Sequence, residues 1–133
     1  RESIAIAPER SRSYISLGLM YESVQAYESA EGVYEAALKH GAASPDILNT
    51  LGVLKLRFRE VESAISLLDQ ALTRDGGRMD TVFNLAFAYA EAGKKREAVN
   101  HLNVFLSRAD RLAFATSVRV AQALKETLLA EGI

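Results

Sequence analysis

The sequence has no cysteine, and only two of its 133 residues are proline. The absence of cysteine excludes disulfides, thiolate metal sites and thiol nucleophiles. Two prolines and eight glycines are too few for a disordered or collagen-like chain. No apolar run approaches the roughly 18 residues of a membrane span, so we expect no membrane insertion of this segment.

Neither basic nor acidic residues are in excess, because 16 basic and 17 acidic residues leave a net charge of −1. A nucleic-acid partner requires a basic face that neutralises phosphates, and we therefore expect none. Nearly half of the residues are apolar and a quarter are charged, which is typical of one soluble globular domain. The chain begins at Arg1 and not at a methionine, so we expect a fragment or a processed product, and the sequence identifies no compartment.

What the sequence does contain is a repeat at one fixed offset, without a gap. Leu17-Gly18 returns 34 positions later as Leu51-Gly52 and again as Leu85-Ala86. Three further sets recur at this offset: Ala30, Ala64 and Ala98; Tyr34, Leu68 and Leu102; and Leu38, Leu72 and Leu106. A fixed period in this range is the signature of a stacked repeat array, which offers an extended surface and no obvious reaction chamber. We therefore predict a protein that is not an enzyme and that holds other molecules.

The apolar spacing predicts helices throughout, and no stretch shows the alternation of a strand. The predicted helices run from about residue 12 to a break near Ser23–Tyr27, from there to His40, and over about 45–58, 62–74, 79–92, 95–107 and 111–130. Gly41 is suited to end the second helix in a left-handed conformation. Ser44-Pro45 reads as an N-cap followed by a proline in the first turn.

The two ends of the chain depart from the repeat. Pro8 discourages a helix through that point, so residues 1–10, which carry Ile4 and Ile6, are expected to form a lead-in. Near the other end the match at the repeat offset fails, because Arg119 falls where a leucine is expected. An apolar stripe nevertheless continues at helical spacing through Phe114, Val118, Ala121, Leu124 and Leu128. This pattern predicts a C-terminal capping helix.

The repeated residues resemble the tetratricopeptide repeat, whose pattern is an aromatic residue, Leu-Gly, Tyr, Ala and a second aromatic residue. The matches are Tyr14, Leu17-Gly18, Tyr21, Ala30 and Tyr34; then Leu48, Leu51-Gly52, Ala64 and Leu68, with Lys55 in place of the tyrosine; then Val82, Leu85-Ala86, Tyr89, Ala98 and Leu102. The resemblance implies an all-α, right-handed α-solenoid of antiparallel helix pairs. The implied division is a lead-in over 1–10, repeats over 11–44, 45–78 and 79–112, and a cap over 113–133, all in one domain.

Small residues explain how such helices approach one another. We expect Gly18, Gly52 and Ala86 to leave room for Ala30, Ala64 and Ala98 on the partner helices. The glycine that the family carries in the turn inside each repeat is present only as Gly93, and Gln25 and Arg59 stand at the equivalent places. These departures loosen the turns without removing the resemblance.

The resemblance implies that partners bind on the concave face, which is lined by the first helix of each repeat. The candidate peptide-binding residues are Ile15, Ser16, Leu19, Asn49, Thr50, Val53, Arg57, Phe83, Asn84 and Phe87. Within this set, Leu19, Val53 and Phe87 form an apolar stripe, and Ser16, Thr50 and Asn84 form a parallel polar row. Such a face suits an extended peptide or an amphipathic helix. The basic clamp with which some relatives bind a C-terminal carboxylate is missing here.

Several alternatives stay open at this stage. The apolar stripe either faces a partner or is buried within the chain, under the lead-in with Ile4 and Ile6. Self-assembly through the open first repeat, or through Leu128, Leu129 and Ile133, competes with peptide binding, as does a role as the targeting domain of a larger protein. His40 and His101 lack ligand spacing, so we expect no metal and no cofactor.

Overall fold

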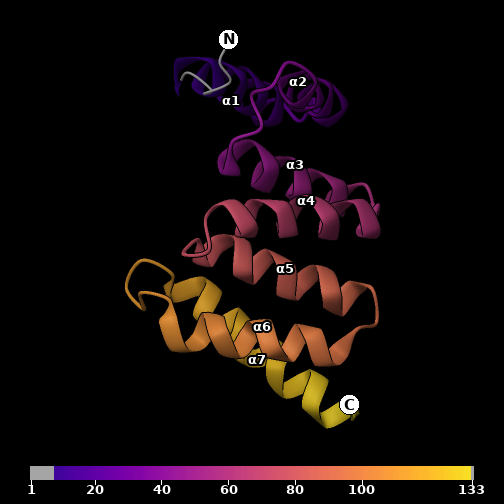
Figure 1. Ribbon diagram of the computed structural model, residues 1–133. Helices are drawn as coiled ribbons and strands as arrows, with labels where there is room; N and C mark the ends of the chain where they lie inside the picture. Colours follow the sequence, from indigo (N-terminus) through magenta and orange to yellow (C-terminus); the bar gives the residue numbers. More distant parts are fainter. Residues whose placement is uncertain (1–7, 133) are drawn as a thin grey trace. The chain divides into compact units, whose positions relative to one another are not determined.

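The structure, a computed structural model, describes residues 8–132 (Figure 1). Over these residues the chain is helical and contains no strand, as the apolar spacing predicts. The helices are α1 (Pro8–Ser23), α2 (Tyr27–Lys39), α3 (Pro45–Arg57), α4 (Val61–Arg74), α5 (Met79–Glu91), α6 (Lys95–Arg108) and α7 (Ala115–Glu131). They fall into two compact units, Arg1–Arg74 with α1 to α4 and Asp75–Ile133 with α5 to α7.

Helix α1 begins earlier than the sequence predicts. Its first residue is Pro8, so the last three residues of the expected lead-in are helical. Proline has no N–H to donate, and the first turn of a helix is where this costs nothing, so Pro8 starts the helix instead of preventing it. Ile4 and Ile6 lie outside the described residues. The division of the chain into repeats, cap and a single domain stays a prediction.

The predicted signals between α2 and α3 are confirmed. Gly41 has φ +80°, the left-handed conformation that ends a helix. Ser44 Oγ accepts a hydrogen bond from the Ile47 backbone N–H at 3.2 Å, and Pro45 is the first residue of α3. Ser44 Oγ also lies 2.7 Å from the hydroxyl of Ser11, which is buried. The N-cap of α3 therefore also ties α3 to the first turn of α1.

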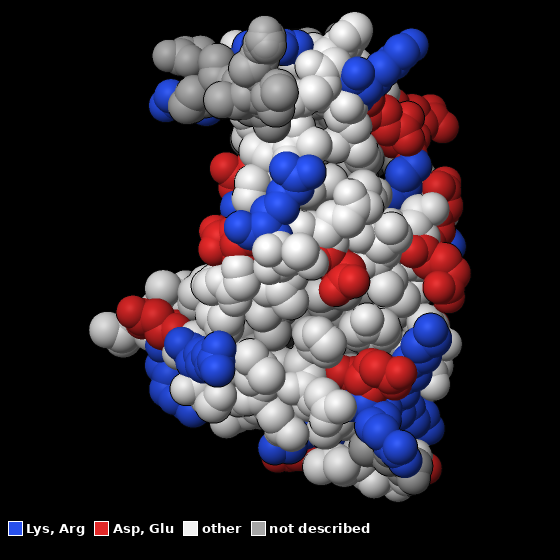
Figure 2. All heavy atoms as spheres, in the orientation of Figure 1, with Lys and Arg blue, Asp and Glu red and all other residues white. Residues whose placement is uncertain are grey.

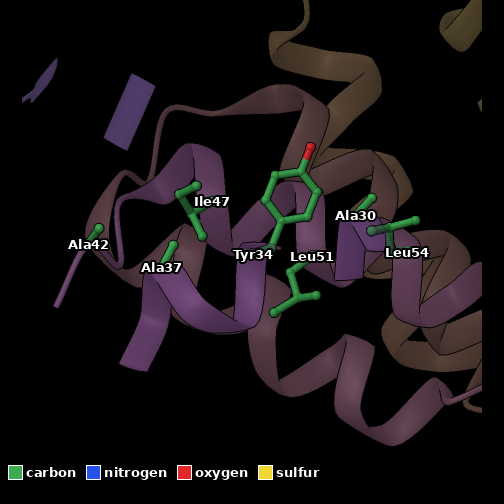
Figure 3. Packing of buried hydrophobic residues seen from close by; sticks show 7 residues of the cluster. All are labelled: Ala30, Tyr34, Ala37, Ala42, Ile47, Leu51 and Leu54. Carbon is green, nitrogen blue, oxygen red and sulfur yellow. The ribbon is translucent and has the colours of Figure 1, made fainter. Parts of the chain in front are cut away.

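The core of the first unit lies where α2 packs against α3 (Figure 3). Its members, each at most 2% exposed, are Ala30, Tyr34, Ala37, Ala42, Ile47, Leu51 and Leu54. Burial of each large side chain in such a core contributes about 1.5–3 kcal/mol. The Tyr34 hydroxyl donates a hydrogen bond to Glu22 Oε2 on α1 at 2.8 Å. Burial raises the pKa of this hydroxyl well above its usual range, and the bond to Glu22 raises the pKa further.

The two glycines of α1 and α3 make room for large side chains. A Cβ placed on Gly18 would lie 2.2 Å from the ring of Tyr34, and one on Gly52 would lie 2.7 Å from Leu68 Cγ. Leu68 Cδ2 lies 2.8 Å from the position on Gly52, and the carbonyl oxygen of Ala64 is further away, at 3.5 Å. The expected contact of these glycines with alanines is therefore secondary, because the ring and the leucine four residues further along the partner helix come closer.

The turns inside the repeats share one left-handed conformation. Gln25 has φ +62°, Arg59 has φ +65° and Gly93 has φ +79°, and these residues stand at the same place in successive repeats. The left-handed region costs a residue with a side chain roughly 1–2 kcal/mol, a cost that glycine does not carry. Two of the three turns therefore keep the family's backbone without the family's residue.

We expect Gln25→Gly to stabilise the chain by about 0.5–1 kcal/mol. The relief of the left-handed strain is partly offset by the greater entropy of glycine in the unfolded chain. Urea unfolding of the two proteins measures the difference. Gly41→Ala, at another left-handed position with open space around it, is the converse control and should destabilise. An unchanged or lower stability of Gln25→Gly would contradict the strain.

The second unit is built around aromatic side chains. Phe105 on α6 is fully buried, with its ring centroid 5.2 Å from that of Phe83 on α5. Phe114, which precedes α7, meets Phe105 edge-on at 5.7 Å. Tilted and edge-on pairs at these distances add roughly 0.5–1.5 kcal/mol beyond the area that they bury. These rings join α5, α6 and the start of α7 in one core.

The last helix is shorter than predicted. Residues 111–114 form a turn, because the Asp110 carboxylate accepts hydrogen bonds from the backbone N–H groups of Leu112 and Ala113. The inner face of α7 is as expected, with Val118, Ala121 and Leu128 buried. Leu128 is only 5% exposed, so its predicted role in self-assembly is wrong, whereas Leu129 is 50% exposed. Ile133 lies outside the described residues.

Candidate protein-binding surface

Nine of the ten candidate binding residues form three rows of equivalent positions, Arg57 stands alone, and the rows differ in exposure. Leu19, Val53 and Phe87 stand at one position of each repeat, and they are 51%, 41% and 42% exposed. Large apolar side chains with this exposure are free to contact a partner. The three residues come from α1, α3 and α5, so the first unit carries two of them and the second unit carries one. The lead-in with Ile4 and Ile6, under which the stripe could instead be buried, lies outside the described residues, so that alternative stays open.

The row next to the stripe is turned toward the interior. Ile15 is half-buried against the core of the first unit, Asn49 is 8% exposed, and Phe83 is half-buried against the ring of Phe105. These side chains support the helices that carry the stripe. They offer a partner little surface, although the sequence placed them among the binding residues.

The polar row of Ser16, Thr50 and Asn84 is only partly exposed. Ser16 is exposed, and Thr50 and Asn84 are half-buried. Arg57 is exposed, and its guanidinium carbon lies 4.0 Å from the centroid of the Tyr27 ring. This cation–π contact joins the end of α3 to the start of α2. Arg57 therefore already has a partner within the first unit.

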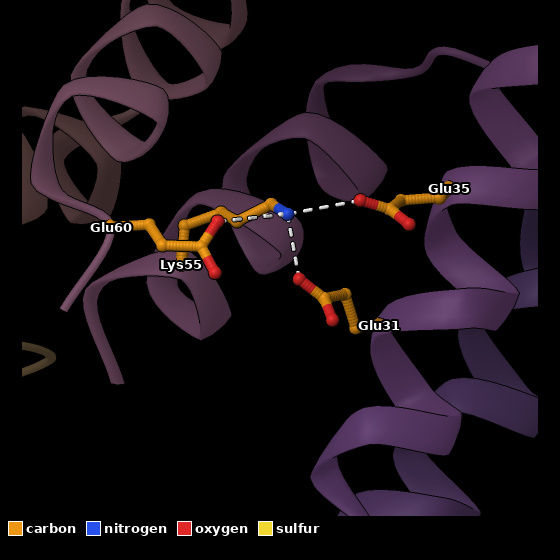
Figure 4. A network of polar contacts seen from close by, with 4 residues as sticks. All are labelled: Glu31, Glu35, Lys55 and Glu60. Carbon is orange, nitrogen blue, oxygen red and sulfur yellow. Dashed lines mark hydrogen bonds and ion pairs between the residues drawn. The ribbon is translucent and has the colours of Figure 1, made fainter. Parts of the chain in front are cut away.

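A cluster of charges that the sequence did not reveal lies in the first unit. Lys55 Nζ is 2.6 Å from Glu31 Oε2, 2.9 Å from Glu35 Oε2 and 3.4 Å from Glu60 Oε1 (Figure 4). The Lys55 side chain is only 11% exposed. Its hydrogen bond to Glu31 raises the pKa of the ammonium group well above the usual range, against the opposing effect of burial. The lysine that replaces the family's tyrosine thus joins α3 to α2 by charge.

Acidic and basic side chains are interspersed on the face seen in Figure 2, and neither sign predominates there. In the second unit Asp80 pairs with Arg78 at 3.0 Å, and Lys95 pairs with Glu131 at 3.1 Å. Both units therefore carry ion pairs, and the chain as a whole is nearly neutral, with a net charge of −1.

Three surface depressions lie away from the stripe. One is beside Lys55 and Leu38, one is at the start of α2 beside Phe58, and one is at the start of α6 beside Gly132. None of the three is lined by a candidate binding residue. Within residues 8–132 no three His, Cys, Asp or Glu side chains are grouped to hold a metal ion. None of the helices in this range has the length and apolar character that crossing a bilayer requires.

Paired helices that recur at one fixed offset, with a small residue of one helix against a large residue of the next, are the architecture of the tetratricopeptide-repeat fold, and this chain has that fold. Similar solved structures include the Yersinia enterocolitica type III secretion chaperone SycD in complex with a peptide of the translocator YopD. It is 16% identical to this chain, with a TM-score of 0.85, and the match covers 96% of this chain and 98% of that one. The TPR2B domain of yeast Sti1 in a pHsp70 complex is 13% identical, with a TM-score of 0.82. The match covers 92% of this chain and 98% of that domain. The Sgt2 TPR domain from Aspergillus fumigatus is 18% identical, with a TM-score of 0.79. The match covers 98% of this chain and 83% of that one.

A family model also identifies the chain at the level of sequence. The model described as coatomer epsilon subunit matches residues 25–128, which is most of the chain. The chain therefore belongs to the coatomer epsilon subunit family. A search of curated proteins found no match.

Proposed function

We propose that the chain is a protein-interaction module that binds a peptide segment on exposed apolar residues of its first helices, which in the first unit are Leu19 and Val53. The observation that carries the proposal is that one position remains apolar and exposed in every repeat, as Leu19, Val53 and Phe87. Apolar residues at neighbouring positions of the same helices, such as Leu51 and Leu85, are at most 1% exposed. A folded chain gains nothing from apolar exposure that recurs with the repeat, whereas a binding surface requires it.

The chemistry around the stripe indicates the kind of peptide. In the first unit, the exposed hydroxyl of Ser16 and the half-buried hydroxyl of Thr50 flank Leu19 and Val53 along α1 and α3. Hydroxyl groups hydrogen-bond a peptide backbone, and apolar side chains receive its apolar anchors. No candidate residue of the first unit except Arg57 is basic, and Arg57 lies on Tyr27. We therefore expect internal, apolar segments to bind, without a requirement for a free C-terminal carboxylate.

The comparisons support this proposal from outside the chain. The similar structures of SycD and Sti1 are complexes, the first with a peptide of YopD and the second with pHsp70. The family is named after a subunit, which is a chain that assembles with others. These similarities concern the fold and the family. The support that comes from this chain itself is the exposure of Leu19, Val53 and Phe87.

We expect Leu19→Glu to weaken peptide binding at least tenfold, because it places a charge at the centre of the apolar stripe of the first unit. The probe is a short peptide selected from a random phage-displayed library on the immobilised chain. Fluorescence anisotropy measures its affinity. The same peptide with an amidated C-terminus should bind as tightly as the free acid.

The matched control is Met20→Glu, which adds the same charge to the next residue of α1, at a nearly equal exposure of 54%. Successive residues point about 100° apart around a helix, so this change leaves the stripe intact. Equal binding by Leu19→Glu and the unaltered chain, or equal losses in both variants, would show that the peptide binds elsewhere.

A further inference from the structure

A second apolar face lies on α1, away from the Leu19 stripe. Leu17, Met20 and Val24, the residue that follows the helix, are 41%, 54% and 69% exposed. With Arg10 and Ser13 they follow the spacing three, four, three, four. This is the spacing of the a and d positions at which two helices pair. We call Arg10, Ser13, Leu17, Met20 and Val24 the α1 seam.

The equivalent face of the next repeat is covered. Leu51 and Leu54, which stand one repeat after Leu17 and Met20, are 1% and 2% exposed and lie in the core between α3 and α2. The sequence therefore provides α1 with the surface by which a first helix packs against a neighbour. Among the equivalent leucines Leu17, Leu51 and Leu85, only Leu17 is exposed.

The helix that packs on the α1 seam is expected to differ from α2 in its charge. Helix α2 packs on α3 with two acidic side chains, Glu31 and Glu35, that are neutralised by Lys55. The residue of α1 equivalent to Lys55 is Tyr21, which has no charge to offer. A helix with the acidic flank of α2 would therefore leave carboxylates without a cation at α1, and this is unfavourable. The α1 seam instead fits an apolar helix face without acidic residues.

The chain itself carries one such face. Beyond α1, the exposed large apolar residues of the described chain are Val53, Phe87, Val104, Leu112, Val120 and Leu129. Each stands alone on its element, except for Val120 and Leu129 of α7. These two are nine residues apart and point to opposite sides of the helix. Within residues 8–132, the helix face that complements the α1 seam is the α1 seam of a second copy.

We propose that two copies of the chain pair through α1, with the helices antiparallel and related by a two-fold axis near Leu17 and Met20. A parallel pair would bring the two Arg10 side chains together. The antiparallel pair keeps the two Arg10 side chains apart, and each guanidinium keeps the hydrogen bond that it donates to the His40 carbonyl of its own copy at 3.0 Å. The interface is isologous, so it closes at the dimer and forms no filament.

The size of the seam sets the strength of the pair. A stable interface buries about 1,600 Å² in total, and one face of a single 16-residue helix on each side falls short of this area. We therefore expect a reversible dimer with a dissociation constant on the order of tens of micromolar. This surface is separate from the peptide-binding stripe, and the two proposals stand or fall separately.

Sedimentation velocity of the full 133-residue chain between about 5 and 500 μM tests the pair. We expect the mass to rise from monomer to dimer over this range, and Met20→Glu to weaken the dimer at least tenfold. Leu19→Glu should dimerise as the unaltered chain does, although it loses peptide binding. Circular dichroism melting of both variants checks that they are folded. A monomer at every concentration, or a dimer that a folded Met20→Glu leaves intact, would overturn the proposal.

Cross-linking locates the contact, because the chain has no cysteine and any introduced thiol is unique. We expect Met20→Cys to form a covalent dimer on oxidation, since residue 20 lies near the two-fold axis, and Leu19→Cys to stay monomeric. Cross-linking through residue 19 in preference to residue 20 would place the contact on another face. Failure of a maleimide to label Met20→Cys in dilute, monomeric protein would assign the seam to the chain's own residues 1–7 and also overturn the pair.

Discussion

Gly18→Ala is expected to destabilise the chain by about 2 kcal/mol, through overpacking of a filled core. A methyl group at this position would lie 2.2 Å from the ring of Tyr34, well inside van der Waals contact. Tyr34 is fully buried among Ala30, Ala37 and Leu51, so its ring has little room to move. Overpacking of this kind costs roughly 1–3 kcal/mol, which exceeds the gain of up to about 1 kcal/mol that alanine brings to a helix interior. Chemical denaturation measures the change.

Gly32→Ala is the matched control for this prediction. Gly32 is also a helical glycine, on α2, but it is exposed and no atom lies within 4 Å of a Cβ built there. Only helix propensity acts at this site, so Gly32→Ala should stabilise by about 0.5–1 kcal/mol. The same methyl group thus gives opposite signs at two glycines of one repeat. If Gly18→Ala were as stable as Gly32→Ala, the close approach of α1 to Tyr34 would be wrong.

The helices and their pairing were predictable because the information is local and repeated. Ser44 and Pro45 define the start of α3 by their own chemistry, and the fixed repeat offset aligns each helix with its equivalents. Pro8 shows the limit of such reasoning. A proline is compatible both with the end of an extended segment and with the first turn of a helix, and only the residues that follow decide between them.

The exposure of the candidate binding residues was not predictable from the sequence. The sequence left open whether Leu19 and Val53 are exposed or buried, and both are exposed, whereas Asn49, a polar residue on the same helix as Val53, is mostly buried. Helical periodicity places a side chain on a face of its helix, whereas burial depends on how far the neighbouring helix covers that face. Leu17 and Leu51 make the same point, because they are the same residue at equivalent positions and are 41% and 1% exposed. Their difference arises from what lies next to α1 and α3.

The charge cluster at Lys55 was outside the reach of the sequence for a similar reason. Its acidic partners Glu31 and Glu35 precede it by 24 and 20 residues and come from another helix. The sequence showed only that a lysine stands where the family has a tyrosine. The structure gives that substitution a role, since the lysine reaches from α3 to α2 and neutralises carboxylates beside the core.

Removal of this charge by Lys55→Met is expected to cost about 2 kcal/mol. Methionine keeps most of the apolar stem and removes the ammonium group, so packing changes little. Glu31, whose side chain is 21% exposed, is then left without its cation beside Glu35 and Glu60. Breaking a buried pair costs about 3–5 kcal/mol, and the half-exposed positions of Glu35 and Glu60 reduce this figure because water solvates them. Urea unfolding at neutral pH measures the loss.

Two further variants and the pH dependence separate charge from packing. Glu35→Gln, at a side chain that is 52% exposed, should cost at most about 0.5 kcal/mol. Adding Glu31→Gln to Lys55→Met should restore part of the loss, because the half-buried carboxylate is removed with its cation.

The folded chain raises the pKa of Lys55, so the contribution of Lys55 to the free energy of unfolding is complete below the ordinary lysine pKa of about 10.4 and is lost as pH rises above it. The stability difference between the unaltered chain and Lys55→Met should therefore be constant from about pH 7 to 9 and narrow above about pH 10.4. A difference that persists undiminished in strong alkali would show that the methionine acts through packing and not through charge.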